Sequence, residues 1–164
     1  ENMLHIIDAS LAKIGIPSDE EEYAMPPSGF DLDKLLLEIL RLVKRTGATR
    51  VAIDSISSLG LNFQSGLEVR KAVLKVSHLL TKMGVTSILT SEIHENSNKY
   101  GKYGVEEYVV DGVISLSYIG VGAHNRTLHI RKMRSTKHSE NVHPIQITDK
   151  GIKILKMEKS YDQA

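Results

Sequence analysis

The chain has 164 residues, of which 41% are hydrophobic and 25% are charged, so it is long enough to bury a core and has an ordinary globular composition. Its 21 basic and 20 acidic side chains nearly cancel, which excludes polyanion binding through overall charge but leaves local basic patches open. Cysteine is absent, which excludes disulfides and thiolate metal sites, and no apolar run approaches the roughly 18 residues of a membrane span, so we expect a cytoplasmic protein without a membrane segment.

The first third of the sequence predicts a strand, a loop and a helix. Residues 4–8 form an apolar run that is typical of a buried strand. Residues 15–29 hold three of the four prolines and an acidic run, which favours an exposed loop. Asp31 is expected to cap a helix with apolar side chains at the 3–4 spacing, and Gly47 to end it. Because the chain lacks an initial methionine and enters an apolar run at once, we expect that an N-terminal portion precedes it.

Strands and helices continue to alternate through the middle of the chain. Residues 50–54 predict a short strand that is apolar enough to be buried on both faces, as strands of parallel sheets are. Residues 67–83 predict a long helix with one apolar face, and residues 85–92 predict the next strand. The lysines of this helix lie near Glu68 on its polar face, so a solvated surface is a better interpretation than a nucleic-acid interface.

The last third of the chain changes character. After a polar surface loop, short runs separated by turn residues predict four strands, three of them in a meander: residues 112–119, 126–133, 143–148 and 151–157. The order of the elements predicts an α/β fold in which helices flank a mainly parallel sheet, with an antiparallel strand cluster at the C-terminal end.

Asp54 follows directly on an apolar strand, where a carboxylate costs free energy unless it meets a metal, a proton or a hydrogen-bond donor. One interpretation is a Walker-B-type residue that serves Mg²⁺ at the carboxyl end of a sheet strand, where ligands of open α/β sheets lie. The next strand ends in Ser91 and Glu92, which supports a site at that edge. The other interpretation is that Asp54 and Ser55 only cap the following segment, and the pattern alone does not separate the two.

A basic cluster lies within eight residues near the C-terminal end and contains Arg131, Lys132, Arg134, Lys137 and His138. On a strand, Lys132 and Arg134 are two residues apart and point the same way. The pair could clamp a polyphosphate, because arginine binds phosphate oxygens bidentately and lysine acts as a point charge. A solvated edge strand that lysine protects from aggregation explains the same charge equally well.

Several other kinds of site lack their sequence patterns. Seven histidines show no zinc-ligand spacing, so a metal site built from protein side chains alone is not expected. The sequence contains no GxSxG nucleophile elbow and no GxGxxG dinucleotide motif. It also contains no GxxxxGK[ST] phosphate loop.

Taken together, the motifs resemble the KaiC-like branch of the RecA superfamily of P-loop ATPases. The segments that carry the resemblance are, in order, LHIIDAS, RVAIDSISSL, GVTSILTSE, YGVEEYVVDGVISL, RTLHIRKMRSTKHSE and HPIQITDKGI, of which the last three are the most specific. The resemblance implies a twisted RecA-like sheet, ATP and Mg²⁺ bound at subunit interfaces, and a homo-oligomeric ring that is usually a hexamer.

The resemblance also implies roles for residues at the two strand ends. The residue that matches Asp54 is the Walker B aspartate that serves Mg²⁺, and we place Ser55 beside it among the nucleotide-binding residues. The residues that match Ser91 and Glu92 lie near the γ-phosphate in a sensor-like place, and we assign Glu92 to the catalytic group.

For the basic cluster, the resemblance implies action between subunits. The residues that match Lys132 and Arg134 reach the γ-phosphate bound by the neighbouring subunit. Those that match Thr136, His138 and Asp149 lie around the same nucleotide. Lys132 and Arg134 would then stabilise charge on the transferred phosphoryl group, as an arginine finger does.

The sequence departs from the family in two places. The family often has glycine where this chain has Ser135, which puts the turn there in doubt. The missing Walker A loop matters more, because its backbone N–H groups do most of the phosphate binding. We therefore interpret residues 1–164 as one RecA/KaiC-like domain without its N-terminal part, which alone binds ATP weakly and does not hydrolyse it. The alternatives are a non-catalytic recombinase-like paralogue in DNA processing and a regulatory subunit whose basic pair serves a neighbour's ATP.

Overall fold

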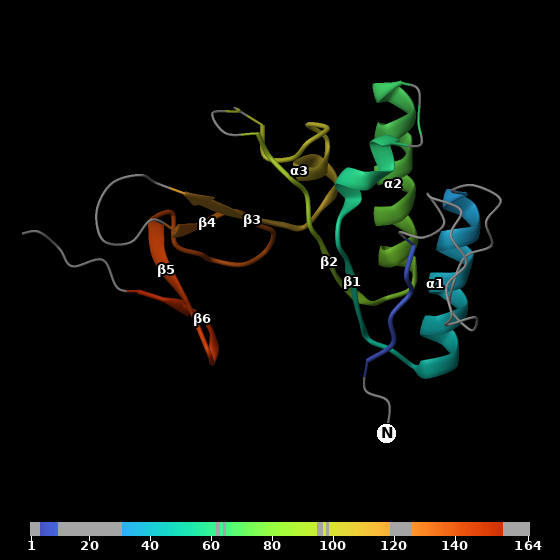
Figure 1. The fold of residues 1–164 in the computed structure, drawn as a ribbon, viewed down its shortest axis with the longest axis horizontal. Coiled ribbons are helices and arrows are strands. Elements are labelled where there is room, and N and C mark those ends of the chain that lie inside the picture. The colour runs from blue at the N-terminus through green and yellow to red at the C-terminus, as the bar shows by residue number, and fades with distance from the viewer. Residues whose placement is uncertain are drawn as a thin grey trace, which may run out of the picture. The chain divides into compact units, whose positions relative to one another are not determined.

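The computed structural model describes residues 4–9, 31–61, 63, 65–94, 97, 99–118 and 126–155. The chain divides into two compact units, Glu1–His94 and Glu95–Ala164, each with its own sheet (Figure 1). The predicted loop over residues 15–29 lies outside the described residues. Whether both units form one RecA-like domain stays a prediction.

The first unit contains two capped helices, and the sequence predicts both helices and the cap of the first. Helix α1 (Leu32–Thr46) begins after Asp31, whose side chain accepts hydrogen bonds from two backbone N–H groups of the first turn. It ends at Gly47, which has a φ of 68°, a left-handed conformation that favours glycine. Helix α2 (Gly66–Lys82) begins with a capping box formed by Ser65 and Glu68. Both predicted helices are therefore confirmed.

The core of the first unit lies along α2. The buried side chains of this helix recur at the predicted spacing, at Val69, Ala72, Val73, Val76 and Leu80. Ile56 and Leu59 of the short 3₁₀ helix η2 (Ile56–Leu61) are also buried. The lysines at 71, 75 and 82 are exposed, and Lys75 forms an ion pair with Asp33 of α1. None of the described helices has the length and apolar character that crossing a membrane requires.

The parallel sheet of the first unit consists of β1 (Arg50–Ile53) and β2 (Thr86–Leu89), with Ile53 opposite Leu89. The predicted burial of the first of these strands on both faces is wrong, because its side chains alternate between exposed and half-buried. Among the described residues, β1 and β2 pair only with each other.

The predicted N-terminal strand is also wrong. Residues 4–8 have no strand conformation, and the side chains of Leu4 and Ile6 are 76% and 70% exposed. The apolar run was the only signal for a strand there, and such a run does not specify a pairing partner. None of the described strands pairs with it.

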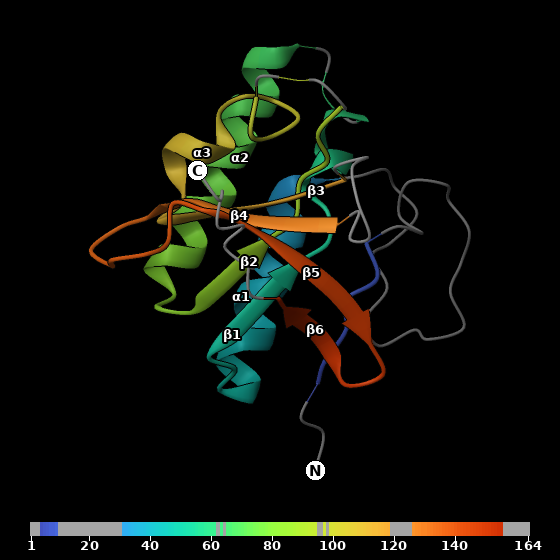
Figure 2. The same ribbon diagram turned by 90° about the vertical axis from the view of Figure 1, so that its left-hand side faces the viewer.

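The second unit is a four-stranded antiparallel sheet in the order β3-β4-β5-β6 (Figure 2). Its strands are β3 (Gly112–Tyr118), β4 (Arg126–Met133), β5 (Val142–Thr148) and β6 (Gly151–Ile154). All four strands form the meander, where the sequence predicted three. A short helix, α3 (Glu106–Val109), precedes them in a segment that was predicted to be a loop. The α/β class, with a parallel sheet, flanking helices and an antiparallel strand cluster, is confirmed.

Candidate functional site

The first group of candidate site residues lies at the carboxyl ends of β1 and β2. Because Ile53 pairs with Leu89 in parallel, Asp54 and Thr90 are the first residues beyond the two strands. The Thr90 N–H donates to the carbonyl of Ile53 at 3.1 Å, and the Thr90 hydroxyl donates to the Asp54 carboxylate at 2.5 Å. The peptide bond between Asp54 and Ser55 is cis. The carboxylate predicted to serve a metal therefore has a hydroxyl partner from the neighbouring strand end.

Two further hydrogen bonds join the segments that follow the strands. The Ile56 N–H donates to the Thr90 carbonyl at 3.0 Å, and the Glu92 N–H donates to the hydroxyl of Ser57, a residue that is only 3% exposed, at 2.8 Å. The structure thus brings four predicted site residues to one edge of the sheet: Asp54, Ser55, Ser91 and Glu92. Asp54 and Glu92 are exposed, whereas the two serines are half-buried.

Sequence reasoning missed Thr90 and Ser57, which hold this edge together. The second strand was predicted to run through Glu92, which hid the fact that Thr90 is the first residue beyond its end. The available signal was a polar residue at the same position after each of two parallel strands. Reading that signal requires the register, which the sequence alone does not supply.

The oxygen donors at this edge suit magnesium. Mg²⁺ prefers carboxylate and hydroxyl oxygens and is usually held by one or two carboxylates, with water and phosphate completing its shell. Asp54 presents an exposed carboxylate that the Thr90 hydroxyl orients. In the part of the chain that the structure describes, no three His, Asp or Glu side chains gather as a metal cage. An ion at Asp54 would therefore take its other ligands from water and a bound phosphate.

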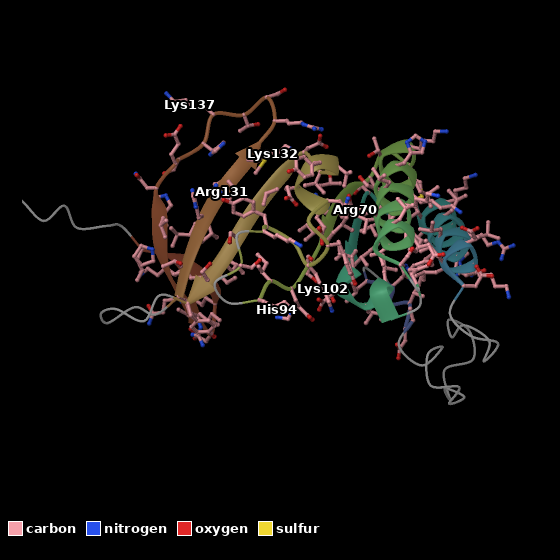
Figure 3. All side chains as sticks on the ribbon, turned by 90° about the horizontal axis from the view of Figure 1, so that it is seen from above. Arg70, His94, Lys102, Arg131, Lys132 and Lys137 are labelled. Atoms are coloured by element: carbon pink, nitrogen blue, oxygen red, sulfur yellow. The ribbon has the colours of Figure 1, made fainter. Side chains whose placement is uncertain are left out.

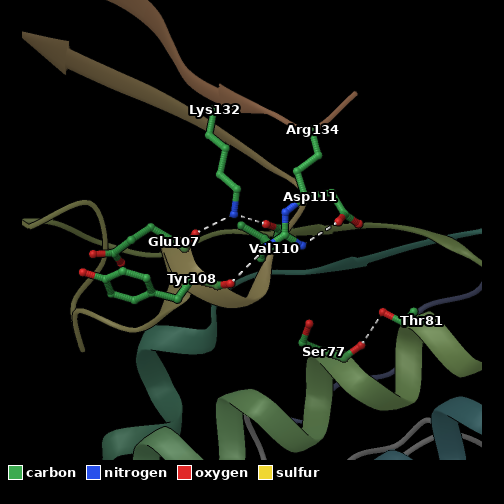
Figure 4. A network of polar contacts seen from close by, with 8 residues as sticks. All are labelled: Ser77, Thr81, Glu107, Tyr108, Val110, Asp111, Lys132 and Arg134. Carbon is green, nitrogen blue, oxygen red and sulfur yellow. Dashed lines mark hydrogen bonds and ion pairs between the residues drawn. The ribbon is translucent and has the colours of Figure 1, made fainter. Parts of the chain in front are cut away.

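Lys132 belongs to the second group of candidate residues, in the other unit. It lies near the end of β4, and its ammonium donates to the carbonyls of Glu107 and Val110 at 2.8 and 2.5 Å (Figure 4). These carbonyls lie at the C-terminal end of α3, where backbone acceptors lack partners within the helix. Lys132 therefore connects β4 to the segment that joins α3 and β3.

Arg134 follows β4 and contacts the same segment between α3 and β3. Its backbone N–H donates to the Asp111 carbonyl at 2.8 Å. One guanidinium nitrogen donates to the Asp111 carboxylate at 3.1 Å, and the other to the Tyr108 carbonyl at 3.4 Å. Ser135 comes next with a φ of 54°, a conformation in which glycine is the favoured residue. The chain thus makes at Ser135 a turn in a conformation that suits glycine.

The remaining basic and polar candidates spread over β4 and two turns. Figure 3 shows Arg131 and Lys132 on β4 and Lys137 in the loop beyond it. The Arg131 guanidinium lies 4.4 Å from the centre of the Tyr100 ring, a cation–π contact. Thr136 and His138 occupy the loop after β4, whereas Asp149 lies in the turn between β5 and β6. No hydrogen bond or ion pair within the described residues joins Asp149 to the cluster.

Glu106 was not predicted and holds the loop before α3. It is 6% exposed, and its carboxylate accepts hydrogen bonds from the N–H groups of Tyr103 and Val105 at 3.1 and 3.0 Å. A Cβ atom on Gly101 would lie 2.4 Å from the carboxylate carbon, so only glycine fits there without movement. The paired glutamates of the sequence were visible as a motif, but their roles differ: Glu106 binds the loop backbone, and Glu107 offers its carbonyl to Lys132.

Comparison with known proteins gives one consistent result. The KaiC ATPase family model matches residues 1–159. The circadian clock oscillator protein KaiC of Synechococcus elongatus is 35% identical over 156 residues, which cover 94% of this chain and 28% of that protein. A UPF0273 protein of Aeropyrum pernix is 36% identical over 153 residues, which cover 93% of this chain and 60% of that protein.

A solved structure agrees with the sequence relatives. The crystal structure of a KaiC-like protein from the hyperthermophilic archaeon Pyrococcus horikoshii has a TM-score of 0.70 and 36% sequence identity to this chain. The likeness covers 84% of this chain and 62% of that one. The chain therefore spans less than two thirds of the length of each of these proteins.

Proposed function

The chain belongs to the KaiC family of ATPases, and from this membership we propose that it is part of a domain that binds and hydrolyses ATP. The observation that carries the proposal is the parallel register of β1 and β2, which sets Asp54 beside Thr90 at the carboxyl edge of the sheet. Nucleotides of open α/β folds bind at such edges. The family match gives no support to the alternative of a recombinase-like paralogue in DNA processing.

Asp54 is the residue that we assign to Mg²⁺. The ion would neutralise charge on the phosphates, and this chain's part is to present the carboxylate at a fixed place. The Thr90 hydroxyl fixes the orientation of Asp54, because a donated hydrogen bond restrains which oxygen faces the site. Ser55, Ser91 and Glu92 lie at the same edge. We assign the two serines to the nucleotide and Glu92 to the catalytic group.

Lys132 and Arg134 of the second unit are assigned to a nucleotide held by another copy of the chain. Lys132 and Arg134 present positive charge there, and Thr136 and His138 follow them in the loop. Asp149 is assigned to the same nucleotide from the turn after β5. Such a division of one site between copies requires a homo-oligomer, and a closed ring of six is the form that we propose.

This chain alone is expected to bind ATP weakly and to leave it intact. Its sequence contains no GxxxxGK[ST] motif, whose backbone N–H groups form the cradle for phosphates in P-loop proteins. The Asp54 carboxylate and the side chains of Lys132 and Arg134 do not replace that cradle, because most of the phosphate charge would remain uncompensated.

Calorimetric titration with MgATP tests the assignment. Asp54→Asn keeps the shape of the side chain and removes its charge, so we expect the affinity for MgATP to fall about tenfold or more, because loss of even an outer-shell partner of a bound metal costs about that much. Glu38→Gln is the matched control, because it removes an exposed carboxylate on α1 that pairs with Arg41. Equal affinities of Asp54→Asn and the parent chain would contradict the metal role, and magnesium-dependent ATP turnover by the parent chain would contradict the expected inactivity.

A further inference from the structure

Ser139 lies at the centre of a small hydrogen-bond network in the loop after β4, residues 134–141. Its hydroxyl oxygen lies 2.8 Å from Nε2 of His143, the second residue of β5. The same hydroxyl accepts a hydrogen bond from the Asn141 N–H at 3.2 Å. Its backbone carbonyl oxygen lies 3.1 Å from Nδ1 of His138. Ser139 thus connects the imidazole of His138 to a strand of the sheet.

The firm end of this network is on β5. His143 is half-buried and pairs with Leu128 of β4, so the antiparallel sheet sets its position, whereas Ser139 is exposed. The bond between them forms with either neutral tautomer of His143, because a hydroxyl both donates and accepts. At the start of the loop, the Thr136 N–H donates to the Met133 carbonyl at 3.3 Å. The Ser139–His143 bond therefore restrains the second half of the loop, which carries His138.

The bond to the Ser139 carbonyl also determines what the neutral ring of His138 offers to a ligand. A carbonyl oxygen only accepts hydrogen bonds, so Nδ1 of His138 carries the proton. Nε2 then keeps its lone pair and is an acceptor. Within the described residues, no hydrogen bond engages this nitrogen. An acceptor suits a hydroxyl or an amine of a ligand, and it repels phosphate oxygens, which are acceptors themselves.

We propose that Nε2 of His138 accepts a hydrogen bond from the nucleoside part of a nucleotide, either from a ribose hydroxyl or from the adenine amine. Ser139 and His143 are positioning residues for this contact, because they fix the place and the tautomer of the ring. The inference rests on the proposed function in one respect, namely that the loop after β4 meets a nucleotide held by another copy. The phosphates of that nucleotide remain assigned to Lys132 and Arg134, whose positive charge complements them.

The tautomer of His138 is measured first, in the full chain without ligand, by long-range ¹H–¹⁵N NMR at about pH 8.5, where imidazole side chains are mainly neutral. We expect the proton on Nδ1. Ser139→Ala and His143→Phe should each give a mixture of both tautomers, because the loop loses its attachment to β5. His143→Gln, whose amide can still bond the Ser139 hydroxyl, should retain the parent tautomer. His129→Phe replaces another half-buried histidine, on β4, and should change nothing.

Nucleotide binding is measured second, by ligand-observed NMR with ATP, ITP, 2′-deoxy-ATP, 3′-deoxy-ATP and inorganic tripolyphosphate. ITP lacks the adenine amine and each deoxynucleotide lacks one hydroxyl, so the three analogues distinguish the possible donors. The parent chain should bind one of them about fivefold more weakly than ATP, the factor for one hydrogen bond between neutral groups. His138→Phe should bind ATP about fivefold more weakly, lose that discrimination and bind tripolyphosphate within about twofold of the parent affinity. Ser139→Ala should reduce the discrimination, and His143→Gln should keep it.

The outcomes that would overturn the inference are distinguishable. A proton on Nε2 of His138 in the parent chain would reject the acceptor role before any nucleotide is added. Equal weakening of ATP and tripolyphosphate binding in His138→Phe would show that His138 binds phosphate, and equal affinities of the parent chain for ATP and the three analogues would reject the nucleoside contact. Both results would leave the proposed function intact.

Two further results concern the positioning residues and the premise. Parent-like tautomer and discrimination in Ser139→Ala would reject the positioning role of Ser139 and His143. Absence of ATP binding by the parent chain would contradict the proposed function together with this inference.

Discussion

Gly101→Ala is the substitution whose effect follows most directly from the geometry. Its new Cβ would lie 2.4 Å from the carboxylate carbon of Glu106 and 2.5 and 2.6 Å from its oxygens, so the carboxylate must move. Movement breaks the two hydrogen bonds that this buried carboxylate accepts from the loop backbone. Each hydrogen bond to a charged group contributes roughly 1.5–3 kcal/mol, and allowing for partial relaxation we expect a loss of about 2–4 kcal/mol.

Urea unfolding followed by circular dichroism measures this loss. Gly66→Ala is the matched control, because nothing lies within 4 Å of the added atom and the residue begins α2. We expect it to be neutral or stabilising by about 0.5–1 kcal/mol. A double-mutant cycle with Glu106→Ala identifies the cause, since the cost of Gly101→Ala should nearly vanish once the carboxylate is gone. An undiminished cost in that background, or a Gly101→Ala variant as stable as the parent, would refute the reasoning.

Three further predictions concern the first unit. Leu80→Ala should cost about 3 kcal/mol in urea unfolding because Leu80 is 1% exposed, whereas Leu74→Ala, at a side chain that is 50% exposed, should cost less than about 1 kcal/mol; similar losses would contradict the assigned core. Ser65→Ala removes the capping box of α2 and should cost about 1 kcal/mol, measured in the same way; an unchanged midpoint would show that the cap is dispensable. Thr90→Val removes the donor to Asp54 and should weaken Mn²⁺ binding about tenfold in a relaxation titration without unfolding the chain; unchanged Mn²⁺ affinity would reject the orienting role.

The parts of the fold that depend on local signals could be predicted from the sequence. Asp31 and Gly47 mark the ends of α1, because a side-chain cap and a left-handed glycine act within one helical turn. The four C-terminal strands could be predicted because turn residues separate short apolar runs. The conformation of residues 4–8 could not be predicted correctly, because strand pairing decides whether an apolar run becomes a strand, and pairing is not local.

The candidate site could be predicted only residue by residue. Asp54 stood out because a carboxylate follows an apolar strand, but its partner Thr90 depends on the register of two strands that lie 36 residues apart. Lys132 and Arg134 stood out by their charge, whereas their different bonding depends on the short helix α3, which the sequence did not reveal. Charge and periodicity identify candidates, and the geometry separates their roles.

We propose that the carboxyl edge of β1 and β2 holds the divalent ion of a nucleotide. Titration of the ¹⁵N-labelled chain with Mn²⁺ and ATP tests it most directly, because Mn²⁺ broadens the signals of nearby amides. We expect broadening to concentrate on residues 54–57 and 90–92 and to be lost in Asp54→Asn. Broadening that spreads evenly over exposed carboxylates, or that persists unchanged in Asp54→Asn, would contradict it.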